Sequence, residues 1–137
     1  MTLALEDRLA VTELIALHGH LVDAGALDRM DEVFTADVVY DLSDFGQGEL
    51  TGLVAVKEAA LALGAGNPVA HHVTNVFVEE IGDDRVHTRS KGLAVMADGS
   101  CGSVTYEDTV IRVGAQWRIS HRRLLARKLP LNGLGQG

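Results

Sequence analysis

Two adjacent histidines open a segment that has the composition of a β-strand. Residues 69–80 read VAHHVTNVFVEE, so His71 and His72 precede a run of Val, Thr and Phe. Imidazole exchanges a proton near neutral pH, and either ring is therefore a candidate general base. Successive side chains of a strand point to opposite faces, so only one of the two can face a given cavity. Neither face of the segment is cleanly polar, and alternation alone leaves the choice open.

Other kinds of catalytic site find little support in the sequence. Zinc needs three or four convergent ligands, whereas neighbouring strand residues diverge and no spaced third ligand follows the two histidines. The glycines form neither a dinucleotide-binding fingerprint nor a phosphate-binding loop, and no Ser or Cys occupies a nucleophile elbow. The single cysteine, Cys101, excludes an internal disulfide and lies in the turn DGSCGS. We therefore expect neither a metal nor a cofactor.

Composition limits the possible partners. The chain has 137 residues, the size of one domain, and its net charge of -7 would repel the phosphate backbone of nucleic acid. No run of 18 apolar residues is present, and the N-terminus MTLALEDRLA is acidic where a signal peptide is basic. These features predict a single cytoplasmic domain, residues 1–137, that binds neither nucleic acid nor membranes.

Hydrophobic spacing predicts three helices in the N-terminal half. Residues 5–24 carry apolar side chains at i, i+3, i+4 and i+7, and this helix should end near Gly25. A short second helix is expected over Leu27–Phe34. A third, rich in Ala and Leu, is expected over Thr51–Leu63 and stops at the breaker cluster GAGNP. Between the second and third helices, Val38–Leu42 resembles a strand and SDFGQGELTG a loop.

From residue 70 onward the hydrophobic period changes to two. Four strands are predicted, over Ala70–Ile81, Arg85–Ala97, Ser103–Val113 and Gln116–Leu125, joined by short connections that suit hairpins. Short links between sequential strands imply a mainly antiparallel meander. The fold class is therefore α+β: three N-terminal helices on the concave face of a curved sheet, with room for an apolar cavity between the layers. The Gly-rich tail, 129–137, is expected to be loose.

Three segments together resemble a known family. LVDAGALDRMDEVFTADVVYDL, HHVTNVFVEE and YEDTVIRVGAQWRISHRR occur in the order typical of the SnoaL-like, scytalone dehydratase-like branch of the nuclear transport factor 2 superfamily. That group of cone-shaped α+β barrels includes scytalone dehydratase, hexachlorocyclohexane dehydrochlorinase, polyketide cyclases and ketosteroid isomerase. The superfamily also contains binding modules and assembly subunits, so the resemblance alone does not fix an activity.

The resemblance implies a catalytic pair. In the dehydratase-like members, an Asp at the end of the first helix holds a His at the start of the strand after the third helix. Asp23 matches that Asp, and His72, directly before VTN, matches the His. A carboxylate that holds one imidazole nitrogen stabilises the imidazolium formed when the other takes a proton. The resemblance therefore selects His72 as the inward base.

Further positions are implied as pocket residues. Scytalone dehydratase has a second histidine on the following strand, where this chain has Met96, so the scytalone reaction itself is not expected. Arg122 matches a pocket arginine of the dehydrochlorinase, and His18 stands where that enzyme has a lysine. Tyr106 falls where scytalone dehydratase has a pocket asparagine, and Asp108 shares its strand face. The family places a pocket tyrosine at the position of Leu42, and Tyr40 lies on the same strand face. For each of these, packing is an alternative explanation.

These features predict a cofactor-independent lyase or isomerase, of dehydratase or cyclase type. Its substrate would be a small hydrophobic molecule of polyketide, steroid or aromatic type. Two alternatives stay open: a binding module that holds a hydrophobic ligand without converting it, and an assembly subunit like the β chains of ring-hydroxylating oxygenases. Val73, Phe77, Trp117 and Ile119 are expected on the sheet face opposite the helices. A homodimer or homotrimer would cover that apolar face.

Overall fold

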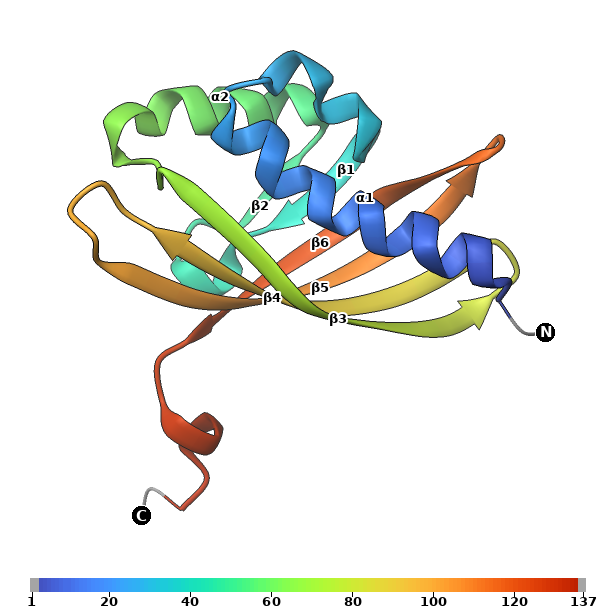
Figure 1. Ribbon diagram of the computed structural model, residues 1–137. Coiled ribbons are helices and arrows are strands. Elements are labelled where there is room, and N and C mark those ends of the chain that lie inside the picture. The colour runs from blue at the N-terminus through green and yellow to red at the C-terminus, as the bar shows by residue number, and fades with distance from the viewer. Residues whose placement is uncertain (1–2, 136–137) are drawn as a thin grey trace.

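A six-stranded sheet carries the structure, and the helices cover one of its faces (Figure 1). The computed structural model describes residues 3–135, apart from the side chain of Glu80. The strand order is β2-β1-β6-β5-β4-β3. The sheet curves toward the helices without closing on itself, as Figure 1 shows, and the predicted α+β class is confirmed.

Two α-helices and a 3₁₀ segment lie on the concave face. Helix α1 spans Leu5–Asp23, the 3₁₀ segment η1 spans Leu27–Glu32, and α2 spans Leu53–Leu63. The inner side of α1 contributes Val11, Leu14, Ile15 and Leu21 to the hydrophobic core. Short 3₁₀ turns also occur at η2 (Ser43–Phe45), η3 (Gly64–Gly66) and η4 (Pro130–Gly133).

The strands form a mixed sheet. They are β1 (Phe34–Asp41), β2 (Glu49–Thr51), β3 (Ala70–Gly82), β4 (Arg85–Val95), β5 (Cys101–Val113) and β6 (Gln116–Arg127). The meander from β3 to β6 is antiparallel throughout, as predicted. The one parallel pair among the described strands is β1 with β6, which joins the β1–β2 hairpin to the meander.

Several predicted boundaries are wrong. The expected helix over Leu27–Phe34 is a 3₁₀ segment that ends at Glu32, and Phe34 instead begins β1. The predicted loop before the third helix contains β2, which pairs with β1 through Val39, Tyr40 and Asp41. Of the tail at 129–137, residues 136 and 137 lie outside the described residues, as do residues 1 and 2.

A β-bulge at Asn75 inverts the alternation of β3. Thr74 pairs with Lys91 and Phe77 with Arg89, so β3 advances three residues where β4 advances two. Asn75 has a φ of 57°, a left-handed conformation that Asn tolerates better than most residues. One extra residue moves every later side chain to the other face. Inward positions are therefore odd-numbered before the bulge and even-numbered after it.

The expected outer face of the sheet is wrong for three of its four apolar residues. Val73 packs against the core, and Trp117 and Ile119 are buried within it. A second irregularity, which leaves Ser120 unpaired between Ile119 and His121, bulges β6 in the same way. Of the four apolar residues expected on the outer face, only Phe77 lies exposed, at 53% of its surface. The expectation of a homodimer or homotrimer rested on this apolar outer face, most of which is absent. The oligomeric state therefore stays a prediction.

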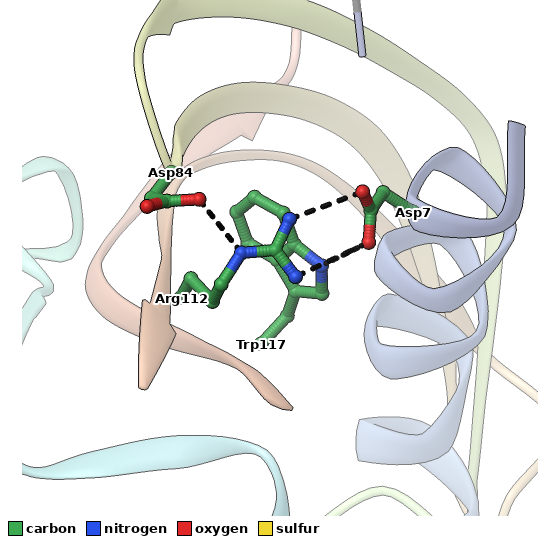
Figure 2. Close-up of polar contacts among 4 residues, drawn as sticks. All are labelled: Asp7, Asp84, Arg112 and Trp117. Atoms are coloured by element: carbon green, nitrogen blue, oxygen red, sulfur yellow. Dashed lines mark hydrogen bonds and ion pairs between the residues drawn. The ribbon is translucent and has the colours of Figure 1, made fainter. Parts of the chain in front are cut away.

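Polar contacts fix the N-terminal end of α1 to the sheet (Figure 2). Asp7, in the first turn of α1, accepts hydrogen bonds from the Arg112 guanidinium at 3.0 and 3.3 Å and from the Trp117 indole at 3.1 Å. Arg112 also donates to Asp84 at 2.7 Å and stacks over the Trp117 ring. These hydrogen bonds hold the pKa of Asp7 below its usual value. The cluster joins α1 to the β3–β4 turn and to the ends of β5 and β6.

We expect Asp7→Ala to lower the thermal midpoint of unfolding, because it leaves Arg112 and the Trp117 N–H without their shared acceptor. Glu6→Ala is the matched control, since Glu6 is a neighbouring exposed carboxylate in the same helical turn. Differential scanning calorimetry of both variants checks this. Equal midpoints for the two variants would contradict the anchoring role of Asp7.

Candidate functional site

A cavity of about 630 Å³ lies between α2, the C-terminal half of α1 and the concave face of the sheet. Its wall is mostly apolar, as is usual for small-molecule sites. The polar and ionisable side chains in the wall are His18, Tyr40, Gln47, Lys57, Asn67, His71 and Tyr106. The apolar part includes Leu27, Met30, Leu50, Val56, Leu63, Val104 and Leu124.

Of the two adjacent histidines, His71 is the one that faces this cavity. Its Nδ1 lies 2.7 Å from Asp23 Oδ1, and the two side chains are 14% and 26% exposed. His72 is exposed and does not belong to the cavity wall. The predicted partner of Asp23, His72, is therefore wrong: Asp23 contacts His71. The physical reason is the strand's alternation, since His71 and Val73 face inward before the bulge at Asn75.

Asp23 is held by three hydrogen bonds at the end of α1. Besides the imidazole contact, its two oxygens accept the backbone N–H of His71 at 2.9 and 3.1 Å. A carboxylate at a helix C-terminus is disfavoured by the helix dipole, and these donors offset that cost. Because an ionised carboxylate only accepts, His71 must carry its proton on Nδ1, which leaves Nε2 as the basic nitrogen.

Gly19 allows α1 to approach β3 closely enough for this contact. A Cβ at position 19 would lie 3.0 Å from the carbonyl oxygen of His71 and 3.4 Å from its Cβ. Gly19 is one helical turn before Asp23, so the same helix face provides the close approach and the carboxylate.

A second histidine lies deeper in the site. His18 is 4% exposed, and its ring makes edge contacts with His71 and Tyr106, each at 6.1 Å between centroids. Burial first, and then the positive charges of Arg122 and His71, holds the pKa of His18 well below 6.5. His18 is therefore a neutral imidazole at physiological pH. Its Nδ1 is buried without a hydrogen-bond partner.

Two tyrosines contribute to the cavity wall. Tyr40 from β1 and Tyr106 from β5 both belong to the wall. Burial is the main cause that raises the pKa of each phenol above 10, so both stay protonated and can donate hydrogen bonds at neutral pH. Gly92 on β4 makes room for Tyr106, because a Cβ at position 92 would lie 2.4 Å from a carbon of its ring.

A fully buried ion pair lies behind Tyr106. Arg122 donates to Asp108 at 2.7 and 2.9 Å, and neither side chain is exposed. The guanidinium carbon lies 4.2 Å from the centre of the Tyr106 ring. Burial alone would lower the pKa of Arg122, but the charge and hydrogen bonds of Asp108 outweigh burial and raise it. The pair is thus a fixed element of the site, although neither residue belongs to the cavity wall.

The structure brings most of the predicted site residues together. His18, Tyr40 and Tyr106 line the cavity, and Asp108 and Arg122 support it from behind. Met96 does not belong to the wall; its backbone N–H bonds Ser100 in the turn after β4. The β4 residue opposite His71 is Ala94, which does line the cavity. The predicted pocket position of Met96 is wrong because β4 ends at Val95.

Sequence reasoning missed the residues that give the site its shape. Gly19 and Gly92 were not singled out, although a Cβ would make a tight contact at position 19 and would overlap the Tyr106 ring at position 92. Helix α2 contributes Val56, Lys57 and Ala60 to the wall. An isolated Gly within a predicted helix or strand is a signal of close packing, and both glycines were detectable on that basis.

Comparison with known proteins places the chain in a family. The SnoaL-like domain model matches residues 3–123, and the chain belongs to this family. No curated protein sequence matches the chain significantly.

Solved structures with this fold carry different names. A candidate aromatic ring hydroxylase from Novosphingobium aromaticivorans is 27% identical over 93% of this chain and 94% of its own, with a TM-score of 0.75. A candidate scytalone dehydratase from the same species is 20% identical over 90% and 86%, with a TM-score of 0.76. LinA is 21% identical over 90% and 88%, also with a TM-score of 0.76. The chain has the nuclear transport factor 2-like fold that its sequence segments indicated.

Among residues 3–135, no three His, Cys, Asp or Glu side chains are grouped as metal ligands. Within the same range, no helix has the length and apolar character needed to span a membrane.

We expect Gly92→Ala to destabilise the protein by about 1–3 kcal/mol, because the added methyl group overlaps the buried Tyr106 ring. Gly102→Ala is the matched control: Gly102 lies on β5, and a Cβ there meets nothing within 4 Å. Urea denaturation of both variants measures the difference. Equal stability of the two would show that the Tyr106 ring is free to move aside.

A second prediction concerns pH. Below pH 6.5 an unfolded chain protonates His18, whereas the folded protein keeps it neutral, so the unfolded state binds more protons and stability falls with falling pH. One such group contributes a slope of at most about 1.4 kcal/mol per pH unit. His18→Gln should therefore lose less stability than the native chain between pH 7 and pH 5. Urea denaturation across that range tests it, and identical slopes would contradict the buried neutral imidazole.

Proposed function

We propose that this protein is a cofactor-independent lyase or isomerase that removes a carbon-bound proton from a small hydrophobic substrate. The general base is His71, and Asp23 orients it. The observation that carries the proposal is the 2.7 Å contact between His71 Nδ1 and Asp23 Oδ1 at the wall of an apolar cavity. His72, which the family resemblance selected for this role, is exposed outside the cavity.

The chemistry follows from the protonation of the pair. With Nδ1–H bonded to Asp23, His71 Nε2 accepts a proton from a carbon next to a carbonyl group, and the C–H electron pair forms an enolate. Asp23 stabilises the resulting imidazolium. The proton then leaves His71 in one of three ways: with a departing group, to a different carbon, or to the oxygen formed when the enolate closes a ring. These are elimination, isomerisation and cyclisation, respectively.

The cavity favours a hydrophobic substrate. Its volume of about 630 Å³ accommodates a molecule of two to four fused rings, and its wall is mainly aliphatic. Tyr106 and Tyr40 are protonated donors that can stabilise a developing enolate oxygen. A polyketide, steroid or aromatic ketone has both the apolar body and the oxygen that this arrangement requires.

A binding module is the second candidate. Two observations favour it: Ala94 and Met96 provide no second proton carrier on β4, and the remaining deep imidazole, His18, is nearly inaccessible. In a binding module, the contacts between Asp23 and His71 would serve only to join α1 to β3.

Hydrogen exchange of a ketone tests the base without knowledge of the physiological substrate. We expect the protein in D₂O to exchange the methyl protons of methyl naphthyl ketone, measured by NMR as loss of the methyl signal. His71→Gln should slow the catalysed exchange by about 10²–10⁴, the usual contribution of a placed general base. His72→Gln, the change of the adjacent and exposed ring, should leave the rate close to that of the native protein.

The two variants also separate the alternatives. Saturable binding of the ketone without exchange would support a binding module. Equal loss of exchange in both variants, or loss only in His72→Gln, would overturn the assignment of His71. Circular dichroism and binding of the ketone by each variant control for misfolding.

A further inference from the structure

Unpartnered polar atoms gather behind the cavity wall around Tyr106. Among the described residues, five buried side-chain atoms have no hydrogen-bond partner, and four of them lie on this inner face: His18 Nδ1, Thr88 Oγ1, Ser90 Oγ and Arg122 Nη1. In the sheet register, Ser90 pairs with Tyr106, and Thr88 pairs with Asp108. Asp108 in turn pairs with Arg122. Buried polar atoms are normally satisfied by water or by a ligand atom. Of these four residues only His18 belongs to the cavity wall, so the end of the cavity next to His18 and Tyr106 is suited to a polar group.

The charges of this cluster cancel. Arg122 is bonded to Asp108 through two nitrogens, and neither side chain is exposed. His18 is neutral, and the hydroxyls carry no charge. The inner end of the site is therefore rich in donors but has no net charge.

A ligand charge would be costly there. A carboxylate next to Tyr106 would add a second negative charge near Asp108, with only the already paired Arg122 to balance both. Taking such a group out of water without a partner of its own is strongly unfavourable. A carbonyl or phenolic oxygen accepts a hydrogen bond from the Tyr106 hydroxyl, whose residue belongs to the cavity wall, without that cost.

We propose that Asp108 sets the charge selectivity of the cavity. By neutralising Arg122, it makes the inner end accept a neutral ligand through a carbonyl or phenolic oxygen and reject a carboxylate of the same shape. This proposal rests on the site of the proposed function but concerns binding and not turnover. It narrows the substrate class to neutral ketones and phenols.

One cation in the wall stands outside this cluster. Lys57, on α2, lines the cavity and is partly buried. If Lys57 bound the carboxylate, the measured affinity would depend on Lys57 and not on the Arg122–Asp108 pair behind Tyr106. Lys57→Met is therefore included as a background that removes this second source of anion binding.

The test compares two ligands of nearly equal shape, methyl naphthyl ketone and naphthoate, by isothermal titration calorimetry. In the Lys57→Met background the ketone should bind at least about tenfold more tightly than naphthoate. Adding Asp108→Asn leaves the charge of Arg122 uncompensated, and naphthoate affinity should then rise by about tenfold or more while ketone affinity changes less. Loss of the native preference, or a folded Asp108→Asn protein without gain in naphthoate affinity, would overturn the proposal.

A second variant covers the case in which Asp108→Asn fails to fold. Tyr106→Phe keeps the ring that lies over Arg122 and removes only its hydroxyl. It should weaken the ketone several-fold and leave ethylnaphthalene, which has no oxygen, unchanged. Equal effects on both ligands, or failure of the ketone to bind at all, would count against the proposal.

Failure of this proposal and failure of the proposed function have different signatures. His71→Gln should keep the preference for ketone over naphthoate while it loses hydrogen exchange. A preserved preference without any exchange in the native protein would refute the catalytic proposal alone. Exchange with no preference between the two ligands would refute only the role of Asp108.

Discussion

The contact between Asp23 and His71 is the constraint on which the site depends. One carboxylate receives two N–H groups of the same residue, its backbone amide and its imidazole, so it fixes both where β3 begins and how the ring is turned. It also ends α1 at the point where the helix meets the sheet. Because Gly19 removes the side chain that would hold the two elements apart, helix position and imidazole orientation are set by one local packing arrangement.

Helix α1 is held at both ends by polar contacts and along its length by the core. Asp7 binds Arg112 and Trp117 at one end, and Asp23 binds His71 at the other. The two attachments have different surroundings: the first joins strand ends far from the cavity, whereas the second faces it. A rigid helix between them makes the cavity a preformed space, which lowers the cost of ordering a ligand there.

Polarity in the site is arranged by depth. A partly exposed imidazole and carboxylate stand at the wall, two protonated phenols come next, and a neutralised ion pair is buried behind them. Burial of the ion pair is expensive unless each partner is hydrogen-bonded, and the two-point contact between Arg122 and Asp108 meets that requirement. The shared fold of differently named proteins agrees with the view that such side chains, and not the scaffold, decide the activity.

The sequence by itself determined the α+β class and the antiparallel meander. Of the cavity wall, sequence analysis named only His18, Tyr40 and Tyr106. Periodicity and short connections are local properties, so they can be counted along the chain. Only the tertiary structure decided that His71 and not His72 faces inward, and that Trp117 and Ile119 belong to the core. Those outcomes depend on the phase of each strand, and one extra residue at Asn75 or Ser120 inverts that phase. The position of a bulge is set by how the strand pairs with its neighbour. The hydrophobic spacing within a single segment carries no information about that pairing.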